Sequence, residues 1–410
     1  MSISFPAAVA VLCAGVWIYL VFFRGAFWRI AKFDDDHRTI SAPQDFPRVC
    51  AIVPARNEAA TIGVTVAALL EQDYHGTFHV LLIDDHSDDG TAEVAKRVAA
   101  ENRGEELLTV HSARPLPEGW TGKLWALNEG VRAACSGPGP GTEDSPDPVP
   151  RHMLAAKAEE LAEYLWFTDA DVEHAPDTLR RLVTRAENDR LDLASLMVLL
   201  RARTFPEKLL IPAFVYFFLQ LYPPRWIANP RSRTAGAAGG CLLIRSKVLE
   251  RIGGLAAIRD ALIDDCTLAR AVKTAGGRLW MGVTRSSVSL RDYRSFGEIR
   301  DMIARTAFTQ LRYSASLLFL TIVGLFLTYI APVVLLFAGA PVSRTLGAVS
   351  SVLLAASFLP TIRYYRLSPA WTLLLPLTAV FYAQATLLSA VRFWLGRGGQ
   401  WKGRAQAPSS

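Results

Sequence analysis

The sequence from Val49 to Thr91 reads VCAIVPARNEAATIGVTVAALLEQDYHGTFHVLLIDDHSDDGT. It holds two short apolar runs, Val49–Val53 and Val80–Asp84, which have the length and composition of buried β-strands. Between them, Thr61–Gln72 has the apolar spacing of a helix, with Thr61 as the expected N-cap. A strand, a helix and a strand in this order predict a βαβ unit with parallel strands. The stretch therefore predicts an α/β fold.

The alternation of strands and helices continues toward the C-terminus. Further helices are expected at residues 91–100 and 124–134, and further strands at 107–110 and 164–168. This spacing predicts a Rossmann-like, mostly parallel, doubly wound sheet. Ligands of such sheets bind at the carboxyl ends of the strands. Residues that follow Val53, Ile83 and Phe167 are therefore expected in one crevice.

Acidic and polar residues gather at these strand ends and before one later helix, at Pro54–Glu58, Asp84–Gly90, Thr168–Asp171 and Asp264–Asp265. Carboxylates crowded after a buried strand are costly unless a cation binds beside them. Asp169 and Asp171 alternate along an extended turn, so both can reach one Mg²⁺ or Mn²⁺ that also takes phosphate oxygens. A solvated turn is the alternative for so short a motif.

Asp85, Lys123 and the pair Asp264 and Asp265 can each be interpreted in two ways, as part of a functional site or as part of the local structure. Asp85 lies where a carboxylate can accept hydrogen bonds from a nucleotide, although Asp-Asp-Gly sequences also form turns without a ligand. Lys123 opens a predicted helix and there can receive a phosphate, or it is a solvated lysine. One of Asp264 and Asp265 is expected to cap the helix that follows, and the other is a candidate general base.

The ends of the chain are apolar. Phe5–Phe23 has no charged residue over 19 positions and is followed by Arg24, Arg29 and Lys32, which places the N-terminus outside and the next segment in the cytoplasm. A cleaved signal peptide is the alternative. Three more uncharged segments read as membrane helices, at residues 314–340, 345–362 and 369–391. Four membrane crossings from an outside N-terminus place the C-terminal tail, residues 392–410, outside. The basic residues of this tail place it inside, so one of the four segments is expected to be re-entrant or interfacial.

The composition agrees with this division. Apolar residues make up 51% of the 410 positions and charged residues 20%, which excludes a disordered chain. The five cysteines lack any C-x-x-C spacing, so neither a disulfide framework nor a zinc site is expected. The formal charge of +6 is compatible with nucleic acid, anionic lipid or a phosphorylated substrate. Because the basic residues flank membrane segments, no nucleic-acid partner is expected.

Six motifs in fixed order resemble the family 2 glycosyltransferases with a GT-A fold: VPARNE, IDDHSDDGT, GKLWALNEG, TDAD, GGCLLIRS and IDDCTLARAVKTAGG. The resemblance implies inverting transfer of a sugar from a nucleotide diphosphate donor, a UDP-sugar, to an acceptor hydroxyl. It assigns donor binding to Pro54, Arg56, Glu58, Asp85, Lys123 and Asp169, metal binding to Asp169 and Asp171, and catalysis to Asp265 with Asp264.

The segment RDYRSFGEIRDMIARTAFTQLRY at residues 291–313 and the apolar ends resemble more narrowly the hopanoid-biosynthesis-associated glycosyltransferases. Membrane-bound family members carry a Q-x-x-R-W segment, for which this chain has Gln310 displaced by one position, Arg312 kept and Tyr313 in place of Trp. Both Gln310 and Arg312 are therefore expected to bind the donor.

The narrower resemblance implies a hopanoid acceptor and an integral protein of the bacterial inner membrane with a cytoplasmic catalytic domain. The same chemistry on polyprenyl phosphate or a ceramide-like lipid is the closest alternative, and a non-catalytic nucleotide-binding scaffold is the second. The expected domains are an anchor at 1–40, the GT-A domain at 45–295 with a flexible insertion at 135–150, an interfacial helix at 296–313, transmembrane helices at 314–391 and a basic tail at 392–410.

Overall fold

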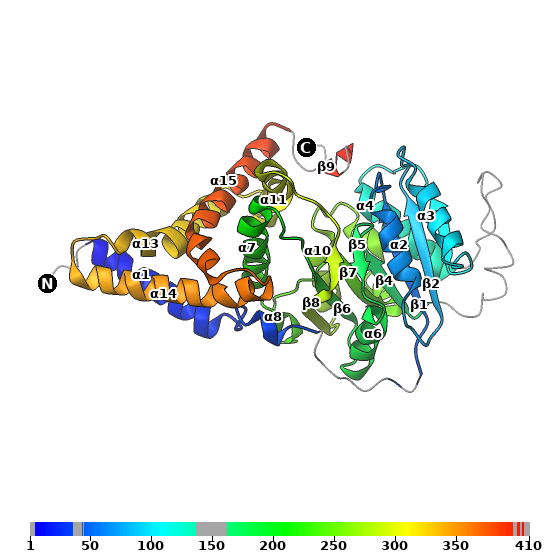
Figure 1. Cartoon of the computed structure of the whole chain (residues 1–410), viewed down its shortest axis with the longest axis horizontal. Coiled ribbons are helices and arrows are strands. Elements are labelled where there is room, and N and C mark those ends of the chain that lie inside the picture. Colours follow the sequence, from blue (N-terminus) through cyan, green and yellow to red (C-terminus); the bar gives the residue numbers. More distant parts are fainter. Residues whose placement is uncertain are drawn as a thin grey trace. The chain divides into compact units, whose positions relative to one another are not determined.

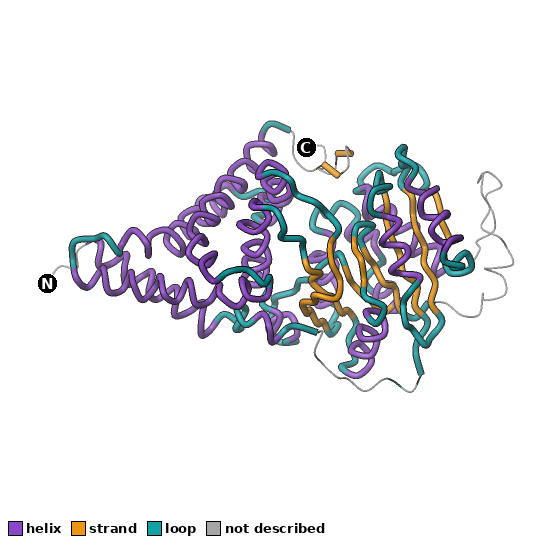
Figure 2. Tube along the Cα trace, in the orientation of Figure 1, coloured by secondary structure: helices purple, strands orange, loops and turns teal. Residues whose placement is uncertain are grey.

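The computed structural model describes residues 5–35, 43, 45–136, 162–396, 400–401 and 404–405. By its internal contacts the chain divides into two compact units. One is built of helices and holds residues 1–33, 201–229 and 292–399; the other contains the large sheet and holds residues 34–200, 230–291 and 400–410. Figure 2 shows this division, with strands of the large sheet confined to the second unit. The expected insertion at 135–150 lies almost wholly outside the described residues.

The sheet unit is a mixed α/β structure whose eight strands run in the order β3-β2-β1-β4-β7-β6-β8-β5 (Figure 1). The strands are β1 (Val49–Ala55), β2 (Phe78–Asp84), β3 (Leu108–Ser112), β4 (Tyr164–Thr168), β5 (Val172–His174), β6 (Leu193–Leu199), β7 (Cys241–Arg245) and β8 (Leu279–Ser289). The half from β3 to β4 is parallel, as the sequence predicted, and β7 runs antiparallel to both β4 and β6. The mostly parallel α/β fold is confirmed.

Helices cover both faces of this sheet. They are α2 (Ile62–Leu70), α3 (Thr91–Glu101), α4 (Gly122–Ser136), α6 (Thr178–Asn188), α9 (Ser246–Arg251) and α10 (Asp264–Thr274), with the 3₁₀-helix η3 (Leu255–Ile258). Side chains alternate between the two faces of a strand. Accordingly Val53 belongs to the core under α2, whereas Ile52 meets α4 on the other face. Thr61 occupies the N-cap position of α2 as predicted, but its side chain makes no capping hydrogen bond, and its hydroxyl donates to the carbonyl oxygens of Glu58 and Ala170.

The approach of α4 to the sheet depends on Gly130. A Cβ atom at this position would lie 2.3 Å from Cγ2 of Ile52 and 3.2 Å from Cγ1 of Ile83. Forcing an extra carbon into a packed interface costs about 1–3 kcal/mol. Glycine therefore sets how closely α4 lies on β1 and β2.

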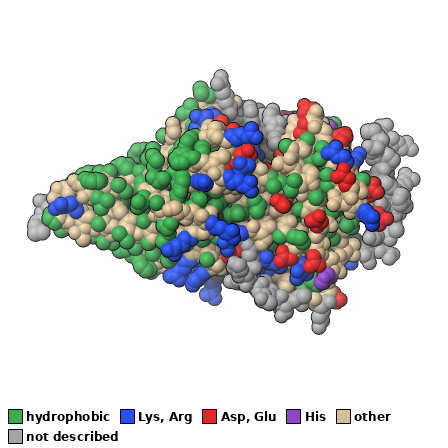
Figure 3. All heavy atoms as spheres, viewed as in Figure 1, with side chains coloured by type: hydrophobic (Ala, Val, Ile, Leu, Met, Phe, Trp, Pro, Cys, Tyr) green, Lys and Arg blue, Asp and Glu red, His purple; other side chains and the backbone are tan. Residues whose placement is uncertain are grey.

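The helical unit contains α1 (Phe5–Ile18), α7 (Phe205–Leu221), α8 (Pro224–Ala228), α11 (Phe296–Gln310), α12 (Ala315–Leu325), α13 (Ala331–Leu335), α14 (Pro341–Tyr364) and α15 (Leu375–Trp394). Among the described residues, four helical segments are long and apolar enough to cross a membrane, namely Phe5–Phe23, Ala315–Leu335, Pro341–Tyr364 and Pro369–Trp394. These are the four segments that the sequence predicted. Their outward side chains are largely hydrophobic, and Figure 3 shows this as green surface.

The helix α7 runs without a break through Pro212, although an interior proline normally interrupts a helix, and most of its side chains are buried. Pro206 sits in the first turn, where no hydrogen bond is lost. Thr204 and Glu207 form a capping box that starts the helix. Contacts group residues 201–229 with the other helices, although these residues lie within the stretch 45–295 in the sequence.

Glu207 also ties two distant segments of the helical unit together. Its buried carboxylate accepts N–H groups from Arg203 at 2.7 Å, Thr204 at 2.9 Å and Tyr293 at 3.0 Å. Burial opposes its ionisation, but these hydrogen bonds and the nearby Arg201 hold the pKa of Glu207 below its usual range. One charged side chain thus fixes the start of α7 to the segment before α11.

Candidate active site

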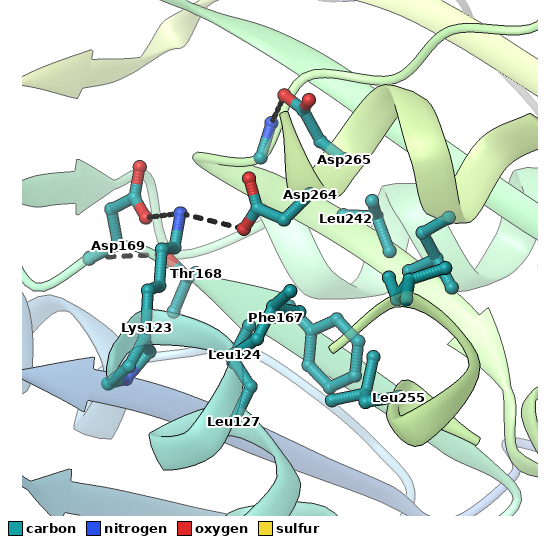
Figure 4. A pocket seen from close by; sticks show the side chains of 14 residues that line it. Lys123, Leu124, Leu127, Phe167, Thr168, Asp169, Leu242, Leu255, Asp264 and Asp265 are labelled. Atoms are coloured by element: carbon teal, nitrogen blue, oxygen red, sulfur yellow. Dashed lines mark hydrogen bonds and ion pairs between the residues drawn. The ribbon is translucent and has the colours of Figure 1, made fainter. Parts of the chain in front are cut away.

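A pocket in the sheet unit lies at the carboxyl ends of β1 and β4 and at the start of α4 and α10 (Figure 4). Five of its lining residues were predicted from sequence: Pro54, Lys123, Asp169, Asp264 and Asp265. The rest of the lining is mainly apolar and comes from Leu124, Leu127, Phe167, Leu242, Leu255, Ile258 and Leu268. The pocket therefore has one charged side and one apolar side.

Lys123 is the centre of the charged side. Its Nζ atom lies 2.7 Å from Oδ1 of Asp169 and 3.4 Å from Oδ2 of Asp264, and both ion pairs are drawn in Figure 4. Burial favours the neutral amine, but Asp169 and Asp264 outweigh it and raise the pKa of Lys123. The side chain is thus a permanent cation in a partly enclosed site. Only 21% of this side chain is exposed, which argues against a solvated lysine, and its binding of a phosphate stays a prediction.

Asp265 is held by two backbone N–H groups. Oδ1 accepts from Cys266 at 2.6 Å and Oδ2 accepts from Gly239 at 2.9 Å. Burial, followed by the charge of Asp264, raises the pKa of Asp265 to about 6, although Lys123 opposes the shift. A carboxylate with a pKa closer to neutrality is a stronger base than an exposed one.

The expectation that one of these two aspartates caps α10 is wrong. The N-cap position belongs to Ile263, and both aspartates lie in the first turn of the helix. The glycine-rich stretch before β7 has a defined role instead, since a Cβ on Gly239 would lie 3.3 Å from Oδ2 of Asp265 and 3.6 Å from Nζ of Lys123. Glycine permits close approach of backbone to carboxylate there.

Asp171 does not line the pocket but follows Asp169 by two residues. Burial and the charges of Asp169 and Glu58 raise the pKa of Asp171 to about 6, against the opposing effect of Arg291 and Lys123. The three carboxylates thus make a locally negative site that a cation would relieve. Within the described part of the chain, no three His, Cys, Asp or Glu side chains converge as a complete metal site. Two carboxylates are sufficient where phosphate oxygens and water complete the shell, as Mg²⁺ prefers.

Hydrogen bonds and an ion pair join the loop after β1 to the loop after β2. Nη1 of Arg56 donates to the carbonyl oxygen of Asp85 and lies 3.7 Å from Oδ2 of the same residue, which is fully buried. Glu58 donates its N–H to Oγ1 of Thr91 at 2.9 Å. The sequence predicts Arg56, Glu58 and Asp85 at one sheet edge; Arg56 does contact Asp85, but none of the three lines the pocket.

The hydrogen bonds that hold this arrangement could not be predicted from the sequence, although most of their residues lie in the clusters Pro54–Glu58 and Asp84–Gly90. Asn57 accepts the N–H of Asp88, Ser87 donates to Asp84, and Asp89 accepts from both Ala59 and Thr91. The sequence does contain a signal for these hydrogen bonds, because both loops are rich in short polar side chains that tend to bond to nearby backbone groups. His174 was also missed: it is buried, bonded to Thr168 and Ser287, and burial lowers its pKa to about 3, so it remains neutral.

Gln310 and Arg312 belong to the helical unit. Nε2 of Gln310 donates to the hydroxyl of Tyr222 at 2.5 Å. Arg312 and Tyr313 follow the end of α11 and both have a positive φ, of 53° and 56°. Such backbone is uncommon for residues other than glycine and costs about 1–3 kcal/mol at each position. Tyr313 stacks on Phe393 at 4.4 Å between ring centroids, which holds this turn in place.

Strand-end carboxylates, a largely buried lysine and a candidate base share one pocket of the α/β sheet, which is the arrangement expected of a group-transfer enzyme of the GT-A type. The chain matches a family described as glycosyltransferase like family 2 over residues 47–300, which is more than half of its length. The protein belongs to this glycosyltransferase family.

Known proteins that are similar to this chain include a synthase and a mannosyltransferase. A beta-monoglucosyldiacylglycerol synthase from Synechocystis sp. is 34% identical over 110 residues, which are 27% of this chain and 22% of that protein. The match thus spans about a fifth of the length of that curated relative. The mannosyltransferase PcManGT from Pyrobaculum calidifontis, solved in complex with GDP-Man and Mn²⁺, is 19% identical with a TM-score of 0.54. The similarity covers 96% of this chain and 100% of that one, and at this identity it concerns the fold alone.

Proposed function

We propose that the protein is a membrane-bound inverting hexosyltransferase that moves a sugar from a nucleotide diphosphate donor to a lipid hydroxyl. The observation that carries the proposal is the pocket in which Lys123 bridges Asp169 and Asp264 beside the hydrogen-bonded Asp265. This pocket lies at the sheet edge where α/β proteins bind nucleotides. The family of the chain supports sugar transfer as the reaction.

Asp265 is the proposed base. It takes the proton of the acceptor hydroxyl while the acceptor oxygen bonds to the anomeric carbon and the bond from that carbon to the diphosphate breaks. The nucleoside diphosphate leaves from the opposite side, so the configuration at the anomeric carbon inverts. The backbone N–H groups of Cys266 and Gly239 hold the carboxylate in one orientation, which a base needs before substrate arrives.

Lys123 is proposed to stabilise the departing diphosphate. Its ammonium is already partly desolvated and is held by carboxylates from two sides, so it meets new negative charge without having to lose a full water shell. Arg312 and Gln310 are proposed as further diphosphate ligands on the strength of their motif. Pro54, Arg56, Glu58 and Asp85 are proposed to hold the nucleotide, for which a UDP group is the first candidate.

Asp169 and Asp171 are proposed to hold Mg²⁺ or Mn²⁺ together with donor phosphate oxygens. A bound divalent ion supplies charge neutralisation for the diphosphate. The excess of negative charge around Asp171 supports this role. The mannosyltransferase of similar fold was solved with Mn²⁺, which also favours a divalent metal.

A lipid acceptor is proposed from the apolar helices and from the relative whose name includes diacylglycerol. Among lipids we propose a hopanoid, with polyprenyl phosphate or a ceramide-like lipid as alternatives. The proposed location is the bacterial inner membrane, with the catalytic domain in the cytoplasm. Arg24, Arg29 and Lys32 directly after the first apolar segment favour this orientation.

The deciding experiment uses the full-length protein in detergent or nanodiscs with a panel of nucleotide sugars. Each donor is combined with a hopanoid, a polyprenyl phosphate, a ceramide or diacylglycerol, and the lipid products are analysed by mass spectrometry. The proposal expects one hexose added to the hopanoid together with release of nucleoside diphosphate. Tight donor binding without release of diphosphate for any acceptor would instead indicate a non-catalytic scaffold.

A further inference from the structure

The helical unit has an unusual charge balance. Residues 1–33, 201–229 and 292–399 contain sixteen Lys and Arg but four Asp and Glu. Residues 1–33, 208–229 and 302–399 contain no acidic residue at all. Figure 3 shows the basic side chains of this unit in groups beside its hydrophobic surface. Asp34 and Asp35 follow Lys32 in the sequence, but both are buried and pair with Arg285, Arg181 and Arg185. An excess of basic residues at the end of an apolar helix indicates an anionic partner.

One such group is built from two segments that are distant in sequence. The guanidinium of Arg24 lies 4.6 Å from the ring of Trp226, and its Nε donates to the carbonyl oxygen of Gln220 at 3.0 Å. Gly25 has a φ of +63°, and a Cβ there would lie 2.8 Å from Cβ of Pro223. The turn after the first apolar segment is therefore packed tightly on the turn between α7 and α8.

Three basic side chains project from this packed turn. Arg29, Lys32 and Arg225 are exposed, and none of them forms an ion pair with a described residue. The guanidinium of Arg29 lies 4.8 Å from the ring of Trp28, whose Nε1 donates to the carbonyl oxygen of Val21 at 2.9 Å. An aromatic ring held in this way orients the cation above it.

Exposed apolar side chains precede these cations in the sequence, at the ends of the apolar helical segments that lead into the two turns. Phe22 and Phe23 are each 67% exposed and Leu221 is 51% exposed. A phospholipid has a matching arrangement of groups, because its apolar acyl chains lie next to a charged phosphate. Tryptophan rings with basic residues beside an apolar segment are typical of the membrane–water interface.

We propose that Arg29, Lys32 and Arg225 form a binding surface for the phosphate groups of anionic phospholipids. The fixed turns carry the three cations, and Phe22, Phe23 and Leu221 contact the acyl region of the same lipids. Anionic lipid is thereby bound in preference to zwitterionic lipid, because a choline headgroup brings its own cation to the phosphate. Basic residues at an anionic surface each contribute about fivefold in affinity.

Native mass spectrometry of the full-length protein in detergent tests this proposal. The protein is titrated with phosphatidylglycerol and, separately, with phosphatidylcholine of the same acyl chains. The wild-type protein is expected to bind phosphatidylglycerol at least tenfold more tightly. The variant R29Q/K32Q/R225Q is expected to lose between ten- and a hundredfold in phosphatidylglycerol affinity and to keep its phosphatidylcholine affinity.

The matched control is K247Q/R251Q/R270Q, which removes the same charges from exposed positions of the sheet unit. It is expected to bind phosphatidylglycerol like the wild type, and all proteins are compared at equal thermal stability and monodispersity. Equal affinity of the wild type for both lipids overturns the proposal. An unchanged preference in R29Q/K32Q/R225Q, or an equal loss in the control, overturns it as well. Full competition by soluble glycerol phosphate would also overturn it, since the surface would then bind free phosphate rather than lipid.

Discussion

The substitution Asp265→Asn tests the centre of the proposed mechanism. It removes the base while keeping the size of the side chain. General base catalysis contributes about 10²- to 10⁴-fold, so kcat is expected to fall by that factor. The donor is proposed to contact other residues, and its dissociation constant is expected to stay within about twofold of the wild type.

The cost to stability follows from the two hydrogen bonds of the carboxylate. Asparagine has one acceptor oxygen, so either the N–H of Cys266 or that of Gly239 loses its partner, which costs about 1.5–3 kcal/mol. A gain in stability opposes this loss, because asparagine is uncharged. The pKa of Asp265 is raised from 3.8 to about 6, so the charged carboxylate is about 3 kcal/mol less favourable in the folded protein than in water. The lost hydrogen bond lowers the free energy of unfolding and the removed charge raises it by a similar amount. The melting temperature of the variant is therefore expected to change by a few degrees at most.

The assay is release of nucleoside diphosphate with a lipid acceptor, together with donor binding by calorimetry. The base form of Asp265 is lost as pH falls through about 6, so wild-type kcat/KM is expected to drop tenfold per pH unit below that value. This acidic limb should be absent from the residual activity of the variant. A variant that retained more than a tenth of wild-type kcat, with the same acidic limb, would refute the assignment of Asp265 as the base.

Four other outcomes are expected. Lys123→Met should weaken donor binding at least tenfold, measured by calorimetry, because it removes the cation beside Asp169; unchanged binding would contradict its role. Removal of divalent metal with EDTA should abolish turnover, and Mn²⁺ or Mg²⁺ should restore it, whereas full activity in EDTA would count against a metal at Asp169. Gly239→Ala should lower kcat several-fold with little change in melting temperature, since its Cβ would lie 3.3 Å from Oδ2 of Asp265; wild-type kcat would show that this approach is unimportant. Glu207→Gln should destabilise the protein by about 2 kcal/mol, seen as a lower melting temperature, because one amide oxygen replaces two that accept three N–H groups, and an unchanged melting temperature would argue against that link.

The fold could be predicted where local signals agreed with the tertiary structure. The strands that begin at Val49 and Tyr164 were found because buried parallel strands are short apolar runs between turn signals. The four apolar segments were found for the same kind of reason, because length and absence of charge decide them. In these regions the hydrophobic pattern alone carries the information.

The α7 helix and the cap of α10 could not be predicted in this way. Pro212 lowers helix propensity locally, but burial of most of α7 stabilises the helix against that cost, and burial is a tertiary effect. Asp264 and Asp265 match the preference for a cap, yet hydrogen bonding to Gly239 from another loop fixes the register of the helix differently. Contacts between residues distant in sequence decided both cases.

The candidate site was predictable in its residue types and only partly in its geometry. Carboxylates at strand ends predicted a site at one edge of the sheet, and five of the predicted residues do line the pocket. The link from Lys123 to both Asp169 and Asp264 could not be foreseen, because it joins three separate parts of the chain. The apolar side of the pocket was missed since its leucines look like ordinary core residues in sequence.

The close contact of Gly130 with Ile52 has a consequence for related sequences. Gly130 lies seven residues after Lys123 on the same helix, about 10 Å along its axis. A larger residue at that position would lift or tilt the helix, and Lys123 would move out of hydrogen-bonding range of Asp169 even though no catalytic motif had changed. A homologue with every recognised motif intact but a bulky residue at this position should therefore be treated as an inactive enzyme until its turnover is measured.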